Sequence, residues 1–229
     1  MAGGTGTRLA VGMPKQMFPL FGKPIMAHTI EKFLAFDQEL LVMAVLHPSL
    51  LHTWTDFVGE FFPDHPSDRL RACAGGAERT HSVYNGLCAL GEAGFPDSGY
   101  VAIHDAVRPF INDEILSQGF DLAMEKGNAV AGVPVKSSLR MLTDEGSQAI
   151  DRSKFFHVQT PQIFSLGEIT QCYREQMDQG KFTDDASVAE ASGKQIHLFT
   201  GSYDNIKITT PEDLVMAERL IERAGDQKG

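Results

Sequence analysis

Cysteines and cationic residues are few in this 229-residue chain, and long apolar runs are missing. The three cysteines are scattered and form no CxxC pair, which argues against structural zinc and predicts a reducing, cytoplasmic location. No signal peptide opens the chain, and no apolar stretch approaches the roughly 20 residues of a membrane span. Lys and Arg number 20 against 30 Asp and Glu, a net charge of −10 that argues against nucleic-acid binding. An anionic small molecule could still bind where the few cations gather in one cleft.

What the chain does contain is a regular alternation of strand-like and helix-like segments. Strands are predicted over Leu40–Leu46, Leu70–Ala74, Tyr100–His104 and Ala129–Val135, and helices over Pro24–Phe36, Asn112–Lys126 and from Thr210 onward. Neither repeats nor linkers interrupt this pattern, so we expect one domain over residues 1–229. The alternation predicts an α/β fold with a mostly parallel twisted sheet flanked by helices.

Residues 136–160 break the alternation. Two strand-like stretches, Ser138–Leu142 and Phe155–Gln159, surround a turn-rich segment at 143–146. The pattern predicts a β-hairpin arm inserted into the domain. Such an arm is either a plain surface excursion or a dimerisation element, and its apolar residues favour packing against a second copy of the chain.

The segment from Ala2 to Leu9 is rich in glycine and is soon followed by Lys15. Glycines let backbone N–H groups approach a polyphosphate closely. The segment lacks the GK[ST] ending of a Walker A loop, and Arg8 falls where a dinucleotide fingerprint would begin its helix. Taken by itself, a glycine-rich turn is as compatible with a plain loop as with a ligand-binding site. Arg8 and Lys15 beside it favour a clamp for negative charge.

Further motifs follow one another along the chain: AGGTGTRL at 2–9, MPKQMFPLFGKPIMAHTIEKF at 13–33, GGAER at 75–79, SVYNGL at 82–87, HDAVRP at 104–109, QTPQ at 159–162, TDDAS at 183–187 and NIKITTPEDL at 205–214. In this order they resemble the cytidylyltransferases of the nucleotide-diphospho-sugar transferase superfamily, and most closely the 2-C-methyl-D-erythritol 4-phosphate cytidylyltransferase family of the non-mevalonate isoprenoid pathway. The resemblance implies a Rossmann-like nucleotidyltransferase fold, a homodimer joined through the β-arm, and CMP transfer from CTP to 2-C-methyl-D-erythritol 4-phosphate with release of pyrophosphate.

The resemblance also implies roles for individual residues. Catalysis is assigned to Arg8, Lys15 and Lys207. Nucleotide binding is assigned to Ala2, Gly3, Gly4, Gly75, Gly76, Arg79, Ser82 and Asp105. Binding of the polyol phosphate is assigned to Arg108, Ser138, Arg152 and Lys207. This chemistry needs no protein nucleophile, only in-line positioning and neutralisation of charge.

Asp105, Lys207 and Ser82 can also be interpreted from the sequence itself. Asp105 follows a predicted strand, at the edge where open α/β sheets bind ligands, and a lone carboxylate there suits Mg²⁺ or another divalent cation. The alternative is a salt bridge to Arg108. Lys207 lies on a short apolar segment, so we expect it to point into a cleft. Ser82 either contacts the nucleotide or caps a helix, and both can hold; His104 is predicted to be structural.

The chain departs from the family pattern in two places. Ser137 and Ser138 replace the more usual Asp-Thr pair, which keeps a hydroxyl at position 138. Only Met1 and Ala2 precede the glycine-rich segment, where family members have a full apolar strand. A parallel sheet without its central strand would leave open hydrogen-bonding edges. We therefore expect that the natural chain starts upstream of Met1 or that this one is shortened.

Two other functions compete with this interpretation. A related enzyme that makes CDP-ribitol shares several of the motifs, but residues 133–138 and 183–187 look more like the erythritol enzyme. A non-catalytic nucleotide-binding module on the same fold is the second alternative. The joint presence of Arg8, Lys15, Asp105 and Lys207 argues against it, because a module that needs only affinity could lose any of them.

Overall fold

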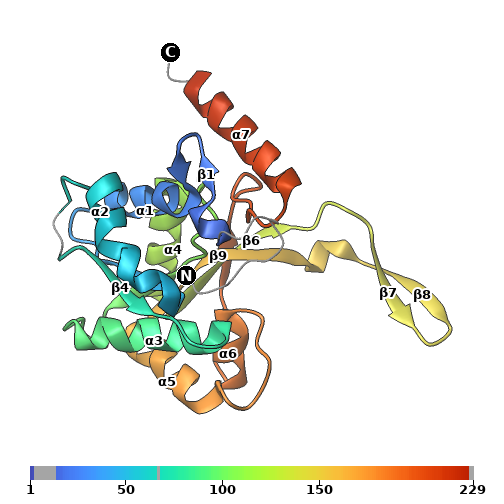
Figure 1. The fold of residues 1–229 in the computed structure, drawn as a ribbon. Coiled ribbons are helices and arrows are strands. Elements are labelled where there is room, and N and C mark those ends of the chain that lie inside the picture. The colour runs from blue at the N-terminus through green and yellow to red at the C-terminus, as the bar shows by residue number, and fades with distance from the viewer. Residues whose placement is uncertain (3–13, 66–67, 227–229) are drawn as a thin grey trace.

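The computed structural model describes residues 1–2, 14–65 and 68–226, without the side chains of the last three. Helices and strands alternate along these residues (Figure 1). In chain order they are the 3₁₀ turn η2 (Lys15–Met17), β1 (Pro19–Leu20), β2 (Lys23–Pro24), α1 (Ile25–Phe36), β3 (Val42–Leu46), η3 (Pro48–Thr53), α2 (Trp54–Phe61), β4 (Leu70–Ala74), α3 (Arg79–Glu92), β5 (Tyr100–Ile103), α4 (Asp113–Lys126), β6 (Asn128–Pro134), β7 (Leu139–Thr143), β8 (Gly146–Ile150), η4 (Arg152–Lys154), β9 (Phe156–Ser165), α5 (Leu166–Gln176), α6 (Asp185–Ala191), β10 (Leu198–Thr200) and α7 (Pro211–Asp226).

The central sheet has four strands in the order β10-β6-β9-β5. β10 is parallel to β6, whereas β9 runs antiparallel to both β6 and β5. β3 and β4 form a separate parallel pair. The predicted α/β fold is confirmed, and its parallel arrangement holds for all of these strands except β9.

Met1 and Ala2 lie between the two sheets. Ala2 forms a parallel bridge with Leu46 at the end of β3. On the other side, the Met1 amino group donates to the carbonyl of His104 at 2.6 Å, and the Ala106 N–H donates to the Met1 carbonyl at 3.0 Å. This is the bonding pattern of parallel strands, so β3 and β5 run in the same direction on either side of Met1.

Helices cover both sides of the sheets (Figure 1). On one side, α1, α2 and α4 gather, with Ile30 of α1 and Phe57 of α2 in one apolar cluster. On the other, α3, α5 and α6 enclose a cluster that includes Val83, Ile169 and Val188. Two apolar layers therefore sandwich the strands, as expected for an α/β protein. Within the described residues no helix has the length and apolar character needed to cross a membrane.

The ends of two helices follow from local sequence as predicted. The Asn112 side chain accepts a hydrogen bond from the Ile115 N–H at 3.0 Å, and Gly127, with φ of 91°, ends α4 in the left-handed conformation. At the start of α7, Pro211 is the first residue and the Thr210 hydroxyl accepts from the Asp213 N–H at 3.3 Å.

The predicted arm is partly right. β7 and β8 form an antiparallel hairpin that stands away from the body of the molecule, and Thr143 pairs with Gly146 across its turn (Figure 1). The assignment of residues 155–159 to the hairpin is wrong, because these residues lead into β9 and His157 pairs with Val133 of the central sheet. Alternating side chains mark a strand but do not identify the strand with which it pairs.

Candidate active site

A pocket of about 230 Å³ lies where the chain leaves β4 and β5, next to Met1. Seven residues predicted for the site line it: Ala2, Lys15, Gly76, Arg79, Ser82, Asp105 and Lys207. Side chains from distant parts of the sequence therefore meet at the carboxyl ends of the strands, where open α/β sheets bind their ligands. A larger apolar cavity of about 650 Å³ lies on the other side of Met1 and holds none of the predicted cations among the described residues.

The Asp105 carboxylate lies between two cations. Its Oδ2 atom is 3.1 Å from Nε of Arg108 and 3.0 Å from Nζ of Lys207. Burial alone would raise the pKa of this carboxyl, but Lys207 and Arg108 hold it well below its usual range. Asp105 is therefore ionised at neutral pH. The salt bridge to Arg108 that the sequence left as an alternative is present, and Lys207 points into the pocket as predicted.

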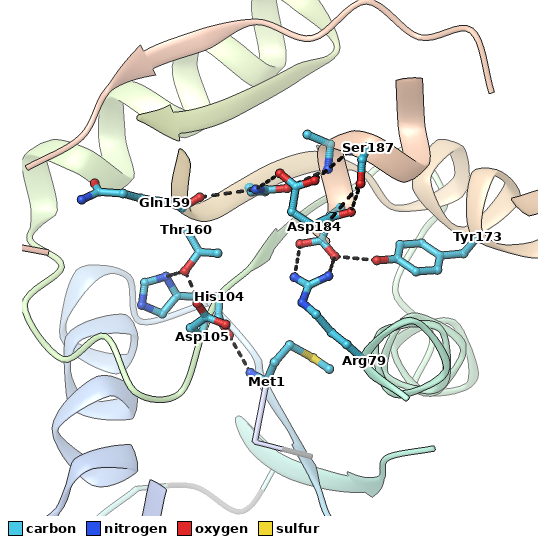
Figure 2. A network of polar contacts seen from close by, with 12 residues as sticks. Met1, Arg79, His104, Asp105, Gln159, Thr160, Tyr173, Asp184 and Ser187 are labelled. Atoms are coloured by element: carbon cyan, nitrogen blue, oxygen red, sulfur yellow. Dashed lines mark hydrogen bonds and ion pairs between the residues drawn. The ribbon is translucent and has the colours of Figure 1, made fainter. Parts of the chain in front are cut away.

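A chain of hydrogen bonds holds the backbone around Asp105 (Figure 2). The Asp105 N–H donates to Oγ1 of Thr160 at 3.0 Å, and this oxygen lies 3.1 Å from Nδ1 of His104. Nε2 of His104 is 3.0 Å from the Arg108 carbonyl, which can only accept, so Nε2 carries the proton and Nδ1 accepts from Thr160. Burial lowers the pKa of His104 to about 4, which keeps the ring neutral. His104 has the structural role predicted for it.

Arg79 is held at the pocket wall by residues that sequence reasoning missed. Its guanidinium makes two hydrogen bonds to Asp185, at 2.8 and 2.7 Å, and the Tyr173 hydroxyl donates to the same carboxylate at 2.5 Å (Figure 2). Asp185 and Tyr173 are fully buried. Burial would lower the pKa of Arg79, but the Asp185 carboxylate raises it above its ordinary value. Asp185 lies in the TDDAS motif, yet no periodicity marked it as a partner of Arg79.

Gly75 and Gly76 form the turn between β4 and α3. The Gly76 N–H donates to Oγ of Ser82 at 3.0 Å, and the Ser82 hydroxyl donates to the Glu78 carbonyl at 2.9 Å. A Cβ atom at Gly76 would collide with the Cβ of His81, so only glycine fits this position. The prediction that Ser82 caps the helix is wrong, because the N-cap of α3 is Glu78 and has no side-chain cap. The Ser82 hydroxyl instead fastens the turn to the first turn of the helix.

Other predicted residues lie away from the pocket or cannot be placed. Gly3, Gly4 and Arg8 lie outside the described residues. Ser138 and Arg152 are exposed on or next to the arm, and the Arg152 guanidinium donates to a neighbouring backbone carbonyl. Neither of them lines the pocket of its own chain.

The side chains of Gln16 and Arg108 hold the backbone next to the pocket in place. Gln16 is 1% exposed and donates to the Ala2 carbonyl at 2.7 Å, a role that its sequence position did not reveal. The Arg108 side chain is 11% exposed and also donates to the Asn205 carbonyl at 2.8 Å. Both side chains therefore fix backbone next to the pocket; Gln16 also lines it, whereas Arg108, predicted to bind substrate, does not.

The residues at the pocket fit a single Mg²⁺ ion that is shared with phosphates. In the described part of the chain, no three His, Cys, Asp or Glu side chains gather as a metal cluster. Mg²⁺ keeps several waters and needs only one or two protein carboxylates when phosphates supply the other ligands. Asp105 is ionised and lines the pocket, so it meets this requirement, although a metal would compete with Lys207 for it. Asp204, another carboxylate close to Lys207 in the sequence, is paired with Arg223.

Comparisons with known proteins agree with this geometry. The model of the 2-C-methyl-D-erythritol 4-phosphate cytidylyltransferase family matches residues 1–223. Relatives of that name from Phocaeicola vulgatus and Bacteroides thetaiotaomicron are 38% and 40% identical over 221 residues, which cover 96% of this chain and 97% of each relative.

Solved structures give the same result. A crystal structure of 4-diphosphocytidyl-2C-methyl-D-erythritol synthase has a TM-score of 0.77 at 27% identity and covers 90% of this chain and 94% of that one. The 2-C-methyl-D-erythritol 4-phosphate cytidylyltransferase of Thermus thermophilus has a TM-score of 0.70 at 27% identity and covers 93% and 96%. The resemblance in the sequence motifs is thereby confirmed, and the chain belongs to the 2-C-methyl-D-erythritol 4-phosphate cytidylyltransferase family.

Proposed function

We propose that this protein transfers CMP from CTP to 2-C-methyl-D-erythritol 4-phosphate and releases pyrophosphate, a step of non-mevalonate isoprenoid precursor synthesis. The observation that carries the proposal is the pocket in which Lys15, Arg79 and Lys207 gather beside an ionised Asp105. In a chain with a net charge of −10, three cations on one small pocket make a local site for an anionic substrate.

The reaction is a phosphoryl-type transfer at the α-phosphorus of CTP. An oxygen of the polyol phosphate forms a bond to that phosphorus while the bond to the bridging oxygen of pyrophosphate breaks, and both electrons leave with pyrophosphate. Lys15, at the pocket wall, together with Arg8 from the glycine-rich segment, would neutralise the charge that grows on the α-phosphate oxygens. Lys207, which also lines the pocket, would orient the attacking phosphate. The protein therefore positions the two substrates and neutralises their charge, and it forms no covalent intermediate with them.

Asp105 would hold the metal. A bound Mg²⁺ would neutralise and orient the triphosphate, a role that another divalent cation could also serve. The Thr160–His104 hydrogen bonds fix the backbone from which the carboxylate projects, so the ligand position is set before substrate arrives. Lys207, paired with Asp105 at 3.0 Å, would bind a phosphate if Asp105 held the metal.

Nucleotide recognition is assigned to the turn after β4 and to the start of the chain. Arg79 and Ser82 lie on the first turns of α3, and the Arg79 side chain at the pocket is 29% exposed, while Asp185 fixes the direction of its guanidinium. Gly76 lines the pocket, whereas Gly75 does not but precedes it in the same turn, and the backbone groups of the two glycines would read a base edge. Ala2, with Gly3 and Gly4 after it, would contact the phosphates.

Polyol-phosphate recognition is assigned to two chains acting together. Arg108 would come from one chain, and Ser138 and Arg152 from the arm of a twofold partner. Exposed apolar side chains on the hairpin support this arrangement, with Leu142 85% exposed and Met141 49% exposed, because such residues are normally covered in a complex. We infer a homodimer in which each arm completes the other chain's site. The three unpaired cysteines support a cytoplasmic location.

The test is pyrophosphate release from CTP and Mg²⁺ with each polyol phosphate added in turn. We expect release with 2-C-methyl-D-erythritol 4-phosphate at a kcat/KM well above that for ribitol 5-phosphate. The reverse order would identify a CDP-ribitol-forming enzyme. A protein that binds CTP and releases no pyrophosphate with either substrate would be a non-catalytic nucleotide-binding module.

A further inference from the structure

The side chain of Gln159, on β9, crosses to the segment at 201–205 that follows β10. It is buried, and its Nε2 atom donates to the Ser202 carbonyl at 2.7 Å while its Oε1 atom accepts from the Ser202 N–H at 3.3 Å. The amide therefore pairs with both main-chain groups of one residue. A Cβ atom at Gly201 would collide with Oε1 of Gln159, so a larger residue there would push the amide aside.

The same amide reaches the carbonyl of Asn205, which lies two residues before Lys207. Nε2 of Gln159 is 3.4 Å from that oxygen, and the Arg108 guanidinium donates to it at 2.8 Å. The Asn205 side chain is fully buried and donates to the Thr160 carbonyl at 2.8 Å. Two adjacent residues of β9 thus fix the chain that leads into Lys207.

The chain is also fixed on the other side of Lys207. The Ile208 N–H donates to the Val107 carbonyl at 2.9 Å, and Ile208 is fully buried. Lys207 lies between these attachments, with its Nζ atom 3.0 Å from Oδ2 of Asp105. Because the Lys207 side chain is 40% exposed, packing holds the ammonium only in part. The position of the main chain therefore decides where the ammonium can reach.

We propose that Gln159 is a positioning residue for Lys207. Its amide holds residues 201–205 against β9 and thereby sets the ammonium where it meets the polyol phosphate, an inference that rests on the role proposed above for Lys207. Gln159 does not line the pocket, so it acts through the chain between Ser202 and Lys207. Such an indirect effect is large enough to measure, since a misplacement of about 1 Å can lower a rate about a hundredfold.

Asn128 is a matched control at the other end of β10. It is buried to the same extent as Gln159, its Nδ2 atom donates to the Gln195 carbonyl at 2.8 Å, and its Oδ1 atom accepts from the His197 N–H at 3.0 Å. Both amides therefore attach the chain to the central sheet, one before β10 and one after it. Neither Asn128 nor residues 195–197 line the pocket, so only the Gln159 attachment leads directly to a pocket residue.

The experiment compares Gln159→Met with Asn128→Leu, which both remove the amide and nearly keep the shape of the side chain. Both should lower the melting temperature, because buried main-chain groups lose their partners. Only Gln159→Met should lower kcat/KM for 2-C-methyl-D-erythritol 4-phosphate, by about tenfold to a hundredfold. The KM for CTP should not change, because the Gln159 side chain points away from Arg79 (Figure 2). Gly201→Ala, which displaces the amide, should give the same result and replaces Gln159→Met if that variant does not fold.

Acetylation of Lys207 in the substrate-free protein, followed by peptide mass spectrometry, is a readout that does not depend on activity. A loosened Lys207 leaves Asp105 more often, so it should be acetylated about tenfold faster in Gln159→Met and at the wild-type rate in Asn128→Leu.

Equal acetylation rates in the two variants would overturn the proposal, and so would equal kcat/KM values after correction for the folded fraction. A wild-type protein that released no pyrophosphate would overturn the proposed function instead. The acetylation rates would then decide alone whether Gln159 positions Lys207.

Discussion

Replacing Asp185 by Asn tests whether the buried pair with Arg79 is as important as its geometry indicates. The substitution keeps the shape of the side chain but removes the charge that compensates a mostly buried guanidinium. Breaking a buried ion pair on one side costs about 3–5 kcal/mol. Because the Arg79 side chain keeps 29% exposure, we expect the lower end of that range, about 3 kcal/mol. In a protein of this size, that corresponds to a fall of about 6–12 °C in melting temperature.

Urea unfolding followed by circular dichroism measures the change in the free energy of unfolding. The control is Glu168→Gln, which breaks the exposed pair with Lys194, at 3.1 Å, and should cost less than about 1 kcal/mol. Replacing both charges together, with Asp185→Leu and Arg79→Met, should recover part of the loss, because no unpaired charge is then left buried. A cost below about 1 kcal/mol for Asp185→Asn, or strictly additive effects in the double variant, would refute this reasoning.

Four further changes have defined outcomes. Lys15→Ala should lower kcat by about a hundredfold with little change in CTP affinity in steady-state assays, and near-normal turnover with weak CTP binding would contradict its role. Asp105→Asn should weaken the Mg²⁺ dependence of the rate and leave the circular dichroism spectrum unchanged. An unaltered dependence on Mg²⁺ would indicate that Asp204 binds the metal instead. Mixed Lys15→Ala and Arg152→Ala chains should recover about a quarter of wild-type activity on subunit exchange, and no recovery despite demonstrated exchange would remove Arg152 from the partner's site. Burial holds the pKa of His104 at about 4, against 6.5 in the unfolded chain. Between pH 6.5 and 4 the unfolded state therefore binds more protons than the folded state, and the free energy of unfolding falls by about 3 kcal/mol from pH 7 to 4. Urea midpoints for a His104→Gln variant should show less of this loss, and an unchanged pH dependence would exclude the histidine as its source.

Local signals in the sequence predicted much of the fold. The Gly127 stop and the Thr210–Pro211 start act within one helical turn, so short sequence patterns were enough to place them. Predicted strand ranges also agreed closely, and β4 matches residue for residue. These features depend on neighbours in the chain and not on distant partners.

Features set by distant partners were not visible in the sequence. β9 was divided between a predicted arm and the following segment, because its pairing with β6 and β5 depends on strands far away in the chain. Asp185 and Tyr173 were missed for the same reason, since only the folded structure brings them to Arg79. Lys15 and Asp105 were found because a charged residue near a glycine turn or at a strand end indicates chemistry without a known partner. Lys207 was found because a charge on a short apolar segment is expected to point into a cleft.

The antiparallel strand β9 also sets the order in which the protein can be made. It lies between β5 and β6, which have no ladder with each other, and the ribosome synthesises it after both. A nascent chain that ends before residue 156 therefore has β5 and β6, but it lacks β9, which lies between them, and the edge strand β10. Lys207, which neutralises Asp105, emerges later still. Folding to the active state must wait for the last quarter of the chain, and fragments truncated before β9 should remain with chaperones instead of folding during synthesis.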